Sequence, residues 1–275
     1  MLVEGAELHY VIEGNGFPCL VIGHAQSYRL LLSRRLRNHF QFTFVDLRHD
    51  ARSKSSLEVS KITLGTYLND IDAVSGALRL GRFAIFGHSH HAYVALQYAR
   101  KYPKKISHVI MTGCAPCDIL HSRRDEFWES DASDERKALF ARKWDKFLKQ
   151  RPKIPTKEQE AASLIAMAPK LLWDLTENLA FVEAAKAVHN DRDVYLRYQL
   201  AILRDYDIGE EGGRITAPVF LALGRYDYVA PYMLWEERRG ALPNLSYNLF
   251  YRSGHFPMFE EQELFDEKLI EWISK

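Results

Sequence analysis

Cysteine is scarce in this chain, with three residues out of 275, and an odd number does not fit a framework of disulfides. Such usage favours a reducing compartment. Cys114 and Cys117 form a Cys-x-x-Cys, but no second pair is present to complete a zinc site. We therefore interpret both as reduced thiols that line or support a pocket.

An excess of charge of one sign is absent too. The formal net charge is +1, which argues against a dedicated nucleic-acid surface. No run approaches the roughly 18 apolar residues of a membrane span. The first residues lack the basic segment and apolar core of a secretory signal. We therefore expect a cytoplasmic protein with neither a membrane nor a nucleic acid as partner.

Internal repeats and low-complexity segments are also missing. Of the 275 residues, 47% are hydrophobic, which is enough to bury one sizeable core. Apolar strand-like runs alternate with helical stretches up to about residue 117, and strands return after residue 213. This order favours a single α/β domain with an insertion.

One turn in this pattern carries a candidate nucleophile. The apolar run Arg82–Phe86 reads as a buried strand, and Gly87-His88-Ser89-His90-His91 follows it directly. Apolar residues then recur at helical spacing until Pro103 ends the helix. A serine on a tight strand-to-helix turn projects its hydroxyl at the carboxyl end of a sheet, beside free backbone N–H groups. Ser89 is therefore expected to act in nucleophilic catalysis.

Two more polar residues follow strand-like runs further along the chain. Asp227 comes after the apolar run Pro218–Leu223, and His255 comes after the alternating run Leu245–Phe250. Loops that follow parallel strands open at the same edge of the sheet. A serine nucleophile needs a base, and the base needs an acid that orients it. The order serine, aspartate, histidine is that of the α/β-hydrolases.

These motifs resemble those of the α/β-hydrolase superfamily from end to end. Gly-Arg-Tyr-Asp with a nearby proline, and Ser-Gly-His before an acidic helix, look most like the prolyl iminopeptidase-like branch. The resemblance implies that Ser89 is the nucleophile, His255 the general base and acid, and Asp227 its orienter. It also implies that the backbone N–H groups of Gln26 and His90 form the oxyanion hole.

The same resemblance implies the architecture. We expect an α/β-hydrolase fold with a mostly parallel, eight-stranded sheet flanked by helices and a helical cap inserted after the sixth strand. Residues 1–117 and 214–275 would form the core, and residues 118–213 the cap. Such a cap would cover Ser89, exclude water and shape the substrate pocket. No metal or organic cofactor is required.

The sequence departs from the family pattern at several glycines. Ala25 replaces a glycine after the first core strand, His91 replaces the last elbow glycine, and two glycines are lost between Asp46 and Ser53. Because glycine allows close backbone approach, we expect a looser helix–strand contact or a compensating local cavity. We also expect Asp70 and Asp72, on a helix from Leu64 to Leu78, to be ordinary surface charges.

Other assignments compete for these residues. Asp118 follows another strand and could replace Asp227, which would then cap a helix. Adjacent histidines such as His90 and His91 point in different directions on one turn, so we expect no metal there. His24 is interpreted as a structural hydrogen-bonding residue.

The most consistent function is hydrolysis of a small carboxylic ester or amide through a covalent acyl-enzyme. The alternatives are a prolyl iminopeptidase-type aminopeptidase that acts on short peptides, a hydrolase-fold ligand receptor with slow turnover, and cofactor-free perhydrolysis or carbon–carbon cleavage. A peptidase would need cap carboxylates for the substrate ammonium group. The oligomeric state stays open. Candidate cap carboxylates are Glu158, Glu160, Asp174, Glu177 and Glu183.

Overall fold

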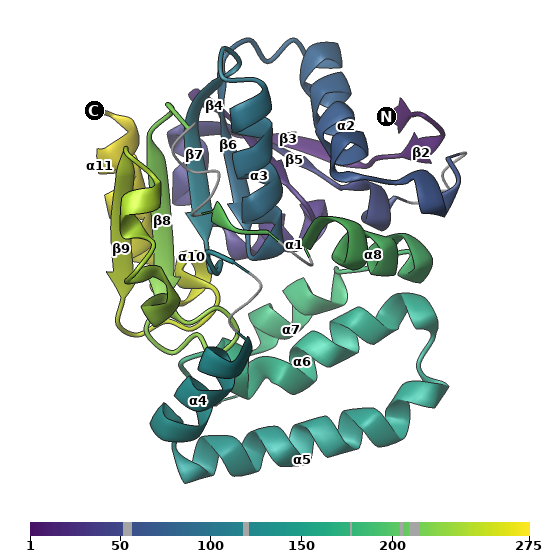
Figure 1. The fold of residues 1–275 in the computed structure, drawn as a ribbon, viewed down its shortest axis with the longest axis vertical. Helices are drawn as coiled ribbons and strands as arrows, with labels where there is room; N and C mark the ends of the chain where they lie inside the picture. Colours follow the sequence, from purple (N-terminus) through teal and green to yellow (C-terminus); the bar gives the residue numbers. More distant parts are fainter. Residues whose placement is uncertain (52–56, 118–120, 177, 204–205, 209–214) are drawn as a thin grey trace.

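A seven-stranded sheet runs through the centre of the computed structural model, which describes residues 1–51, 57–117, 121–176, 178–203, 206–208 and 215–275 (Figure 1). The strand order is β3-β5-β4-β6-β7-β8-β9. Every neighbouring pair is parallel except β3 with β5. The strands are β3 (Tyr10–Glu13), β4 (Phe17–Ile22), β5 (Phe40–Val45), β6 (Phe83–His88), β7 (Ile106–Thr112), β8 (Val219–Gly224) and β9 (Leu245–Phe250).

The first two strands of the chain lie outside this sheet, in which eight strands were expected. Instead, β1 (Leu2–Val3) and β2 (Ala6–Glu7) pair only with each other. Between them Glu4 and Gly5 both have positive φ angles, which turn the chain back on itself. The fold class is confirmed, but the predicted count of eight strands in one sheet is wrong, because this turn closes a separate two-stranded ribbon.

Helices cover both faces of the sheet, because the buried strands carry apolar side chains on both sides. On one face Leu20 and Ile85 pack in a cluster with residues of α2 (Leu64–Ala77) and α3 (His90–Lys101). On the other face a second cluster includes residues of α1 (Ala25–Leu31) and α11 (Gln262–Ile273). The short α10 (Pro257–Glu260) comes directly before α11 in the chain.

One expected surface charge is buried. Asp70 on α2 is 1% exposed and accepts hydrogen bonds from Arg48, with its Oδ2 2.8 Å from the Arg48 Nε. The prediction of a solvated Asp70 is wrong, because helical spacing alone did not reveal that a buried arginine lies opposite. Burial raises the pKa of Asp70 to about 6, although the hydrogen bonds and charge of Arg48 oppose that shift.

A group of helices lies between β7 and β8 in the chain and beyond one end of the sheet in space (Figure 1). Arg136 helps to hold it together, because its guanidinium donates to the backbone carbonyls of Pro169, Leu172 and Trp173. If β1 and β2 count as one strand, this insertion follows the sixth strand of the chain. The helices are α4 (His121–Asp131), α5 (Asp134–Gln150), α6 (Gln159–Leu171), α7 (Leu179–Lys186) and α8 (Arg192–Tyr198).

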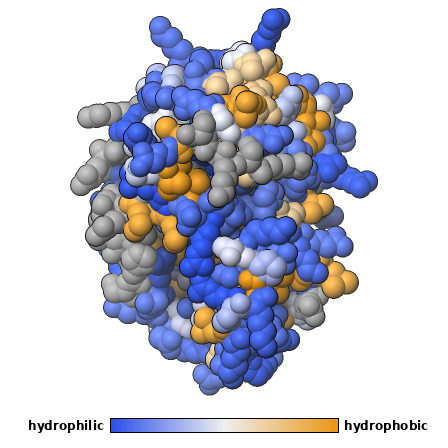
Figure 2. All heavy atoms as spheres, turned by 90° about the vertical axis from the view of Figure 1, so that its right-hand side faces the viewer, coloured by the Kyte–Doolittle hydropathy of each residue, from blue (hydrophilic) through white to orange (hydrophobic). Residues whose placement is uncertain are grey.

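The hydropathy of the surface and the state of the cysteines agree with what the composition predicts. The face turned to the viewer in Figure 2 is largely hydrophilic, with smaller hydrophobic groups scattered over it. None of the described helices combines the length and apolar character needed to cross a membrane. Cys19, Cys114 and Cys117 are all buried, and none of the three forms a disulfide with another described residue.

Candidate active site

Ser89 occupies a strained turn between β6 and α3. Its φ of 54° and ψ of −130° lie outside the regions that L-residues prefer. The backbone N–H of Ser89 donates to the Thr112 carbonyl at 2.8 Å, which anchors the turn to the end of β7. A Cβ on Gly87 would lie 2.5 Å from the His91 carbonyl oxygen, so this glycine permits the helix to start close to the strand. The side chain of Ser89 is half-buried.

The structure brings His255 and Asp227 together. The Nδ1 of His255 donates to the Oδ2 of Asp227 at 2.7 Å. The other oxygen of Asp227 accepts the backbone N–H groups of Val229 and Ala230, at 2.9 and 2.8 Å. Asp227 is fully buried and His255 is 4% exposed. The carboxylate therefore fixes the ring of His255 and its own loop at once. The competing candidate Asp118 lies outside the described residues.

In the part of the chain that the structure describes, the Oγ of Ser89 makes no hydrogen bond. None of the described residues thus competes for this hydroxyl. Hydrogen bonds between a catalytic nucleophile and its base are often long before substrate binds.

His88 supports His255 in a way that the sequence did not reveal. Its Nε2 lies 2.9 Å from the backbone carbonyl of His255, and the two rings meet edge to face, with their centroids 4.6 Å apart. Its ring also stacks on Phe256. Burial lowers the pKa of His88 well below the usual range for histidine. His88 is therefore a neutral ring that positions the loop of His255.

The two expected oxyanion donors both lie in first helical turns. Gln26 is the second residue of α1, and His90 is the first residue of α3. The first N–H groups of a helix have no partner within the helix, so they can bind an anion. The backbone N–H of Ala25 donates to the Oδ1 of Asp46 at 2.8 Å, which fixes the start of α1. Because Ala25 begins α1 and does not have a positive φ, alanine replaces glycine there without strain.

A cluster of histidines surrounds the elbow, and burial dominates its electrostatics. The pKa of His49 is lowered to about 4, and those of His90 and His91 lie well below the usual range, in each case chiefly because the ring is buried. For His24, burial alone would lower the pKa, but the charge and hydrogen bond of Asp50 raise it.

The inserted helices are tied directly to the loops of His255 and Asp227. The backbone N–H of His255 donates to the Leu171 carbonyl at 2.6 Å, and that of Tyr228 to the Lys170 carbonyl at 3.1 Å. A Cβ on Gly254 would lie 2.2 Å from the Leu171 carbonyl oxygen, so glycine allows this approach. The end of α6 and the histidine loop therefore form one hydrogen-bonded unit.

Among the candidate cap carboxylates, Glu160 stands apart. Glu158, Asp174 and Glu183 are exposed, and Glu177 lies outside the described residues. Glu160 is half-buried at the start of α6 and interacts electrostatically with His24. Burial raises its pKa, and the charge of His24 opposes that shift.

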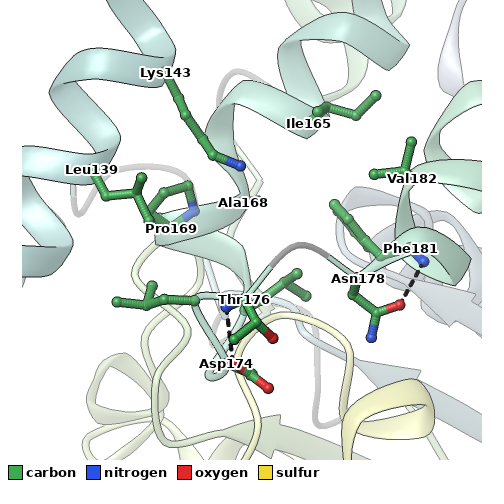
Figure 3. Close-up of a pocket in the computed structure, with 12 residues that line it drawn as sticks. Leu139, Lys143, Ile165, Ala168, Pro169, Asp174, Thr176, Asn178, Phe181 and Val182 are labelled. Atoms are coloured by element: carbon green, nitrogen blue, oxygen red, sulfur yellow. Dashed lines mark hydrogen bonds between the residues drawn. The ribbon is translucent and has the colours of Figure 1, made fainter.

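Glu160 also lines a cavity of about 220 Å³ between α5, α6 and α8, together with Tyr195. A separate pocket, drawn in Figure 3, lies between α5, α6 and α7. Lys143, Ile165 and Phe181 line that pocket, whereas Ser89, Asp227 and His255 do not.

Comparison with known proteins places the whole chain in one family. The family model for the alpha/beta hydrolase fold matches residues 16–262. The AB hydrolase superfamily protein YclE of Bacillus subtilis is 33% identical to this chain, over 99% of the chain and 97% of that protein.

More distant similarities include enzymes of different specificity. A proline iminopeptidase of Xylella fastidiosa is 25% identical, over 82% of this chain and 77% of that enzyme. The solved esterase EaEST from Exiguobacterium antarcticum has a TM-score of 0.75 and 19% identity, over 100% of this chain and 98% of that one. The fold, the match along nearly all of its length and these relatives show that the chain belongs to the α/β-hydrolase family.

Proposed function

We propose that this hydrolase cleaves a small carboxylic ester or amide through a covalent acyl-enzyme. His255 takes the proton of Ser89 as its Oγ bonds to the substrate carbonyl carbon. The oxyanion that forms accepts hydrogen bonds from the backbone N–H groups of Gln26 and His90, each contributing about 3 kcal/mol to lowering the barrier. As the bond to the leaving group breaks, His255 donates the proton to it. A water molecule, deprotonated by His255, then attacks the acyl carbon and releases the acid and free Ser89.

The observation that carries this proposal is the 2.7 Å contact between His255 and Asp227. Both residues are buried at the sheet edge where the strained turn holds Ser89. A buried carboxylate bonded to Nδ1 leaves Nε2 as the free base, because a neutral imidazole carries its proton on one nitrogen. The imidazolium that forms during proton transfer is stabilised by the same carboxylate.

A second candidate activity is hydrolysis of an aminoacyl amide, as in the iminopeptidase relatives. The observation that favours it is the half-buried Glu160, whose charge interacts with His24 beside the oxyanion loop. A carboxylate in that position would attract the α-ammonium group of a substrate. The resemblance to iminopeptidases does not extend to the elbow itself, Gly87-His88-Ser89-His90. We therefore place the ester or simple amide first.

The nucleophile is tested by labelling with a fluorophosphonate probe and by counting turnovers on p-nitrophenyl acetate and butyrate. The wild-type protein should label rapidly and turn over many times. Ser89→Ala should not label, and its turnover should fall on the order of 10⁴ to 10⁶-fold. Wild-type turnover in Ser89→Ala would refute the nucleophile, and rapid labelling with a single turnover would favour a receptor.

The substrate class is tested by comparing these esters with proline p-nitroanilide. Glu160→Gln should raise KM for the anilide but not for the esters if the aminopeptidase assignment is correct. Glu158→Gln, two residues away and exposed, is the matched control. Ester turnover without any cleavage of the anilide would reject the aminopeptidase.

A further inference from the structure

Five potential ligands from three chain segments converge beside the elbow. His24 precedes α1, His49 and Asp50 follow β5, and His90 and His91 begin α3. Two sets of three each offer ligand atoms that all lie within 4.8 Å of one another. One set is His24 with His90 and His91, and the other is His24 with His49 and Asp50. His24 is therefore common to both sets.

We propose that this cluster binds one divalent transition-metal ion, with His24, His49 and Asp50 as protein ligands. His49 and Asp50 are 0% and 1% exposed. The Nδ1 of His24 lies 3.0 Å from Oδ1 of Asp50, and the Nε2 of His49 lies 3.5 Å from Oδ2 of Asp50. Around a tetrahedral zinc ion with bonds of about 2.0–2.1 Å, ligand atoms lie about 3.3 Å apart. Small side-chain rotations would thus suffice to close the site.

A buried oxygen without a partner is the observation that distinguishes a metal site from a cluster of neutral rings. Among the described residues, the Oδ2 of Asp50 makes no hydrogen bond, although the His49 ring lies close to it. A buried carboxylate oxygen normally has a hydrogen-bond donor or a cation beside it, because leaving it alone carries the full cost of its lost hydration. A bound cation would satisfy this oxygen directly.

Tyrosine hydroxyls hold the rings in the orientation that a metal site needs. The Tyr67 hydroxyl lies 3.1 Å from Nδ1 of His49, so the opposite nitrogen faces Asp50. The Tyr28 hydroxyl lies 2.7 Å from Nδ1 of His91, whose Nε2 is 3.4 Å from Nε2 of His49. Metal-binding histidines almost always carry such a partner on the second ring nitrogen. His91 therefore lies beside the proposed ligand His49 but belongs to the other set of three.

The chemistry of the donors selects the kind of ion. Imidazole nitrogens with one carboxylate suit zinc and its neighbours cobalt, nickel and copper, whereas calcium and magnesium prefer oxygen ligands. The ion would link the segment of His24, which leads into α1 and its Gln26 N–H, to the segment after β5. The site would thereby fix the oxyanion loop.

A purely hydrogen-bonded arrangement is the competing interpretation. A chain from Tyr28 through His91 and His49 to Tyr67 can be satisfied by neutral rings alone. That arrangement needs no ion, but within the described ranges it leaves the Oδ2 of Asp50 without a hydrogen bond. The two interpretations differ in whether the folded protein binds metal stoichiometrically.

The test uses the full chain, freed of metal with a chelator and titrated with Co²⁺ and then Zn²⁺. The wild-type protein should bind one equivalent of Co²⁺ with visible d–d absorption, and Zn²⁺ should displace it and raise the Tm. His24→Gln, at the least buried of the proposed ligands, should weaken binding at least tenfold, as should Asp50→Asn.

Two control variants separate loss of the metal site from loss of a histidine elsewhere and from loss of the proposed nucleophile. His39→Gln removes an exposed histidine outside the cluster and should bind like wild type. Ser89→Ala should also keep the metal while losing turnover, so the site and the proposed function can fail independently. Absence of stoichiometric Co²⁺ binding in the wild type would overturn the proposal, as would equal affinity in His24→Gln and His39→Gln.

Discussion

The ring of His91 occupies the space that a side chain at Gly23 would fill. A Cβ on Gly23 would lie 2.2 Å from Nδ1 of His91, and the φ of Gly23 is +108°. The histidine that replaces the usual elbow glycine is thus accommodated by a glycine at the end of a neighbouring strand. The contact that we expected to be loose, or to leave a cavity, is closely packed.

This relationship predicts that Gly23→Ala is destabilising. The new methyl group would clash with the His91 ring, and the positive φ disfavours any side chain. We expect the free energy of unfolding in urea to fall by about 2 to 4 kcal/mol. Gly76→Ala is the matched control, because no atom of the described residues would lie within 4 Å of its Cβ in helix α2 and alanine favours a helix. Equal stability of Gly23→Ala and wild type would contradict the packing described.

Asp227→Asn tests the contact with His255. An amide at this position can still accept the N–H groups of Val229 and Ala230, so the fold should survive. It cannot stabilise an imidazolium and favours the wrong tautomer of His255, so kcat/KM for ester substrates should fall by about 10³ to 10⁴. Asp145→Asn, on the exposed side of α5, should leave activity unchanged. A loss of less than tenfold in Asp227→Asn would reject its role.

From the burial of Glu260 we predict that this residue contributes to the stability of the folded protein in a pH-dependent way. Burial raises its pKa to about 8, while the backbone N–H groups of Trp173, Gly254 and Phe256 oppose the shift. In the unfolded chain a glutamate titrates near pH 4.3. The folded state therefore binds the extra proton, and this stability is fully present below the unfolded pKa and is lost as the pH rises through about 8.

The measurement compares wild type with Glu260→Gln, which does not titrate, by urea unfolding from pH 5 to 9. The stability of wild type relative to the variant should fall with rising pH, by up to about 1.4 kcal/mol per unit. Glu263→Gln, on an exposed position of α11, should follow the wild-type profile. A difference between wild type and Glu260→Gln that does not change with pH would show that Glu260 titrates normally.

Arg136→Met tests how the inserted helices are held. The change removes the donor that serves three backbone carbonyls, those of Pro169, Leu172 and Trp173, and leaves buried oxygens unpaired. We expect a loss of about 3 kcal/mol in the free energy of unfolding and faster proteolysis of the helices. Arg142→Met, on the same helix but exposed, is the control. Proteolysis at the same rate in both variants would exclude this role for Arg136.

The sequence by itself determined the α/β alternation, the turn that carries Ser89, and the strand ends from which Asp227 and His255 project. These features depend on local patterns, in which an apolar run, a glycine and a polar residue follow one another along the chain. Because parallel strands align their carboxyl ends, that order alone was enough to predict that Asp227 and His255 lie at one sheet edge.

Only the tertiary structure decided which buried polar groups meet. His24 and Asp50 lie 26 residues apart but touch, because β4 and β5 are neighbours in the sheet and the segments after both leave it at the same edge. Likewise, His88 meets the carbonyl of His255 across 167 residues. No local period encodes such contacts, since strand order and register set them.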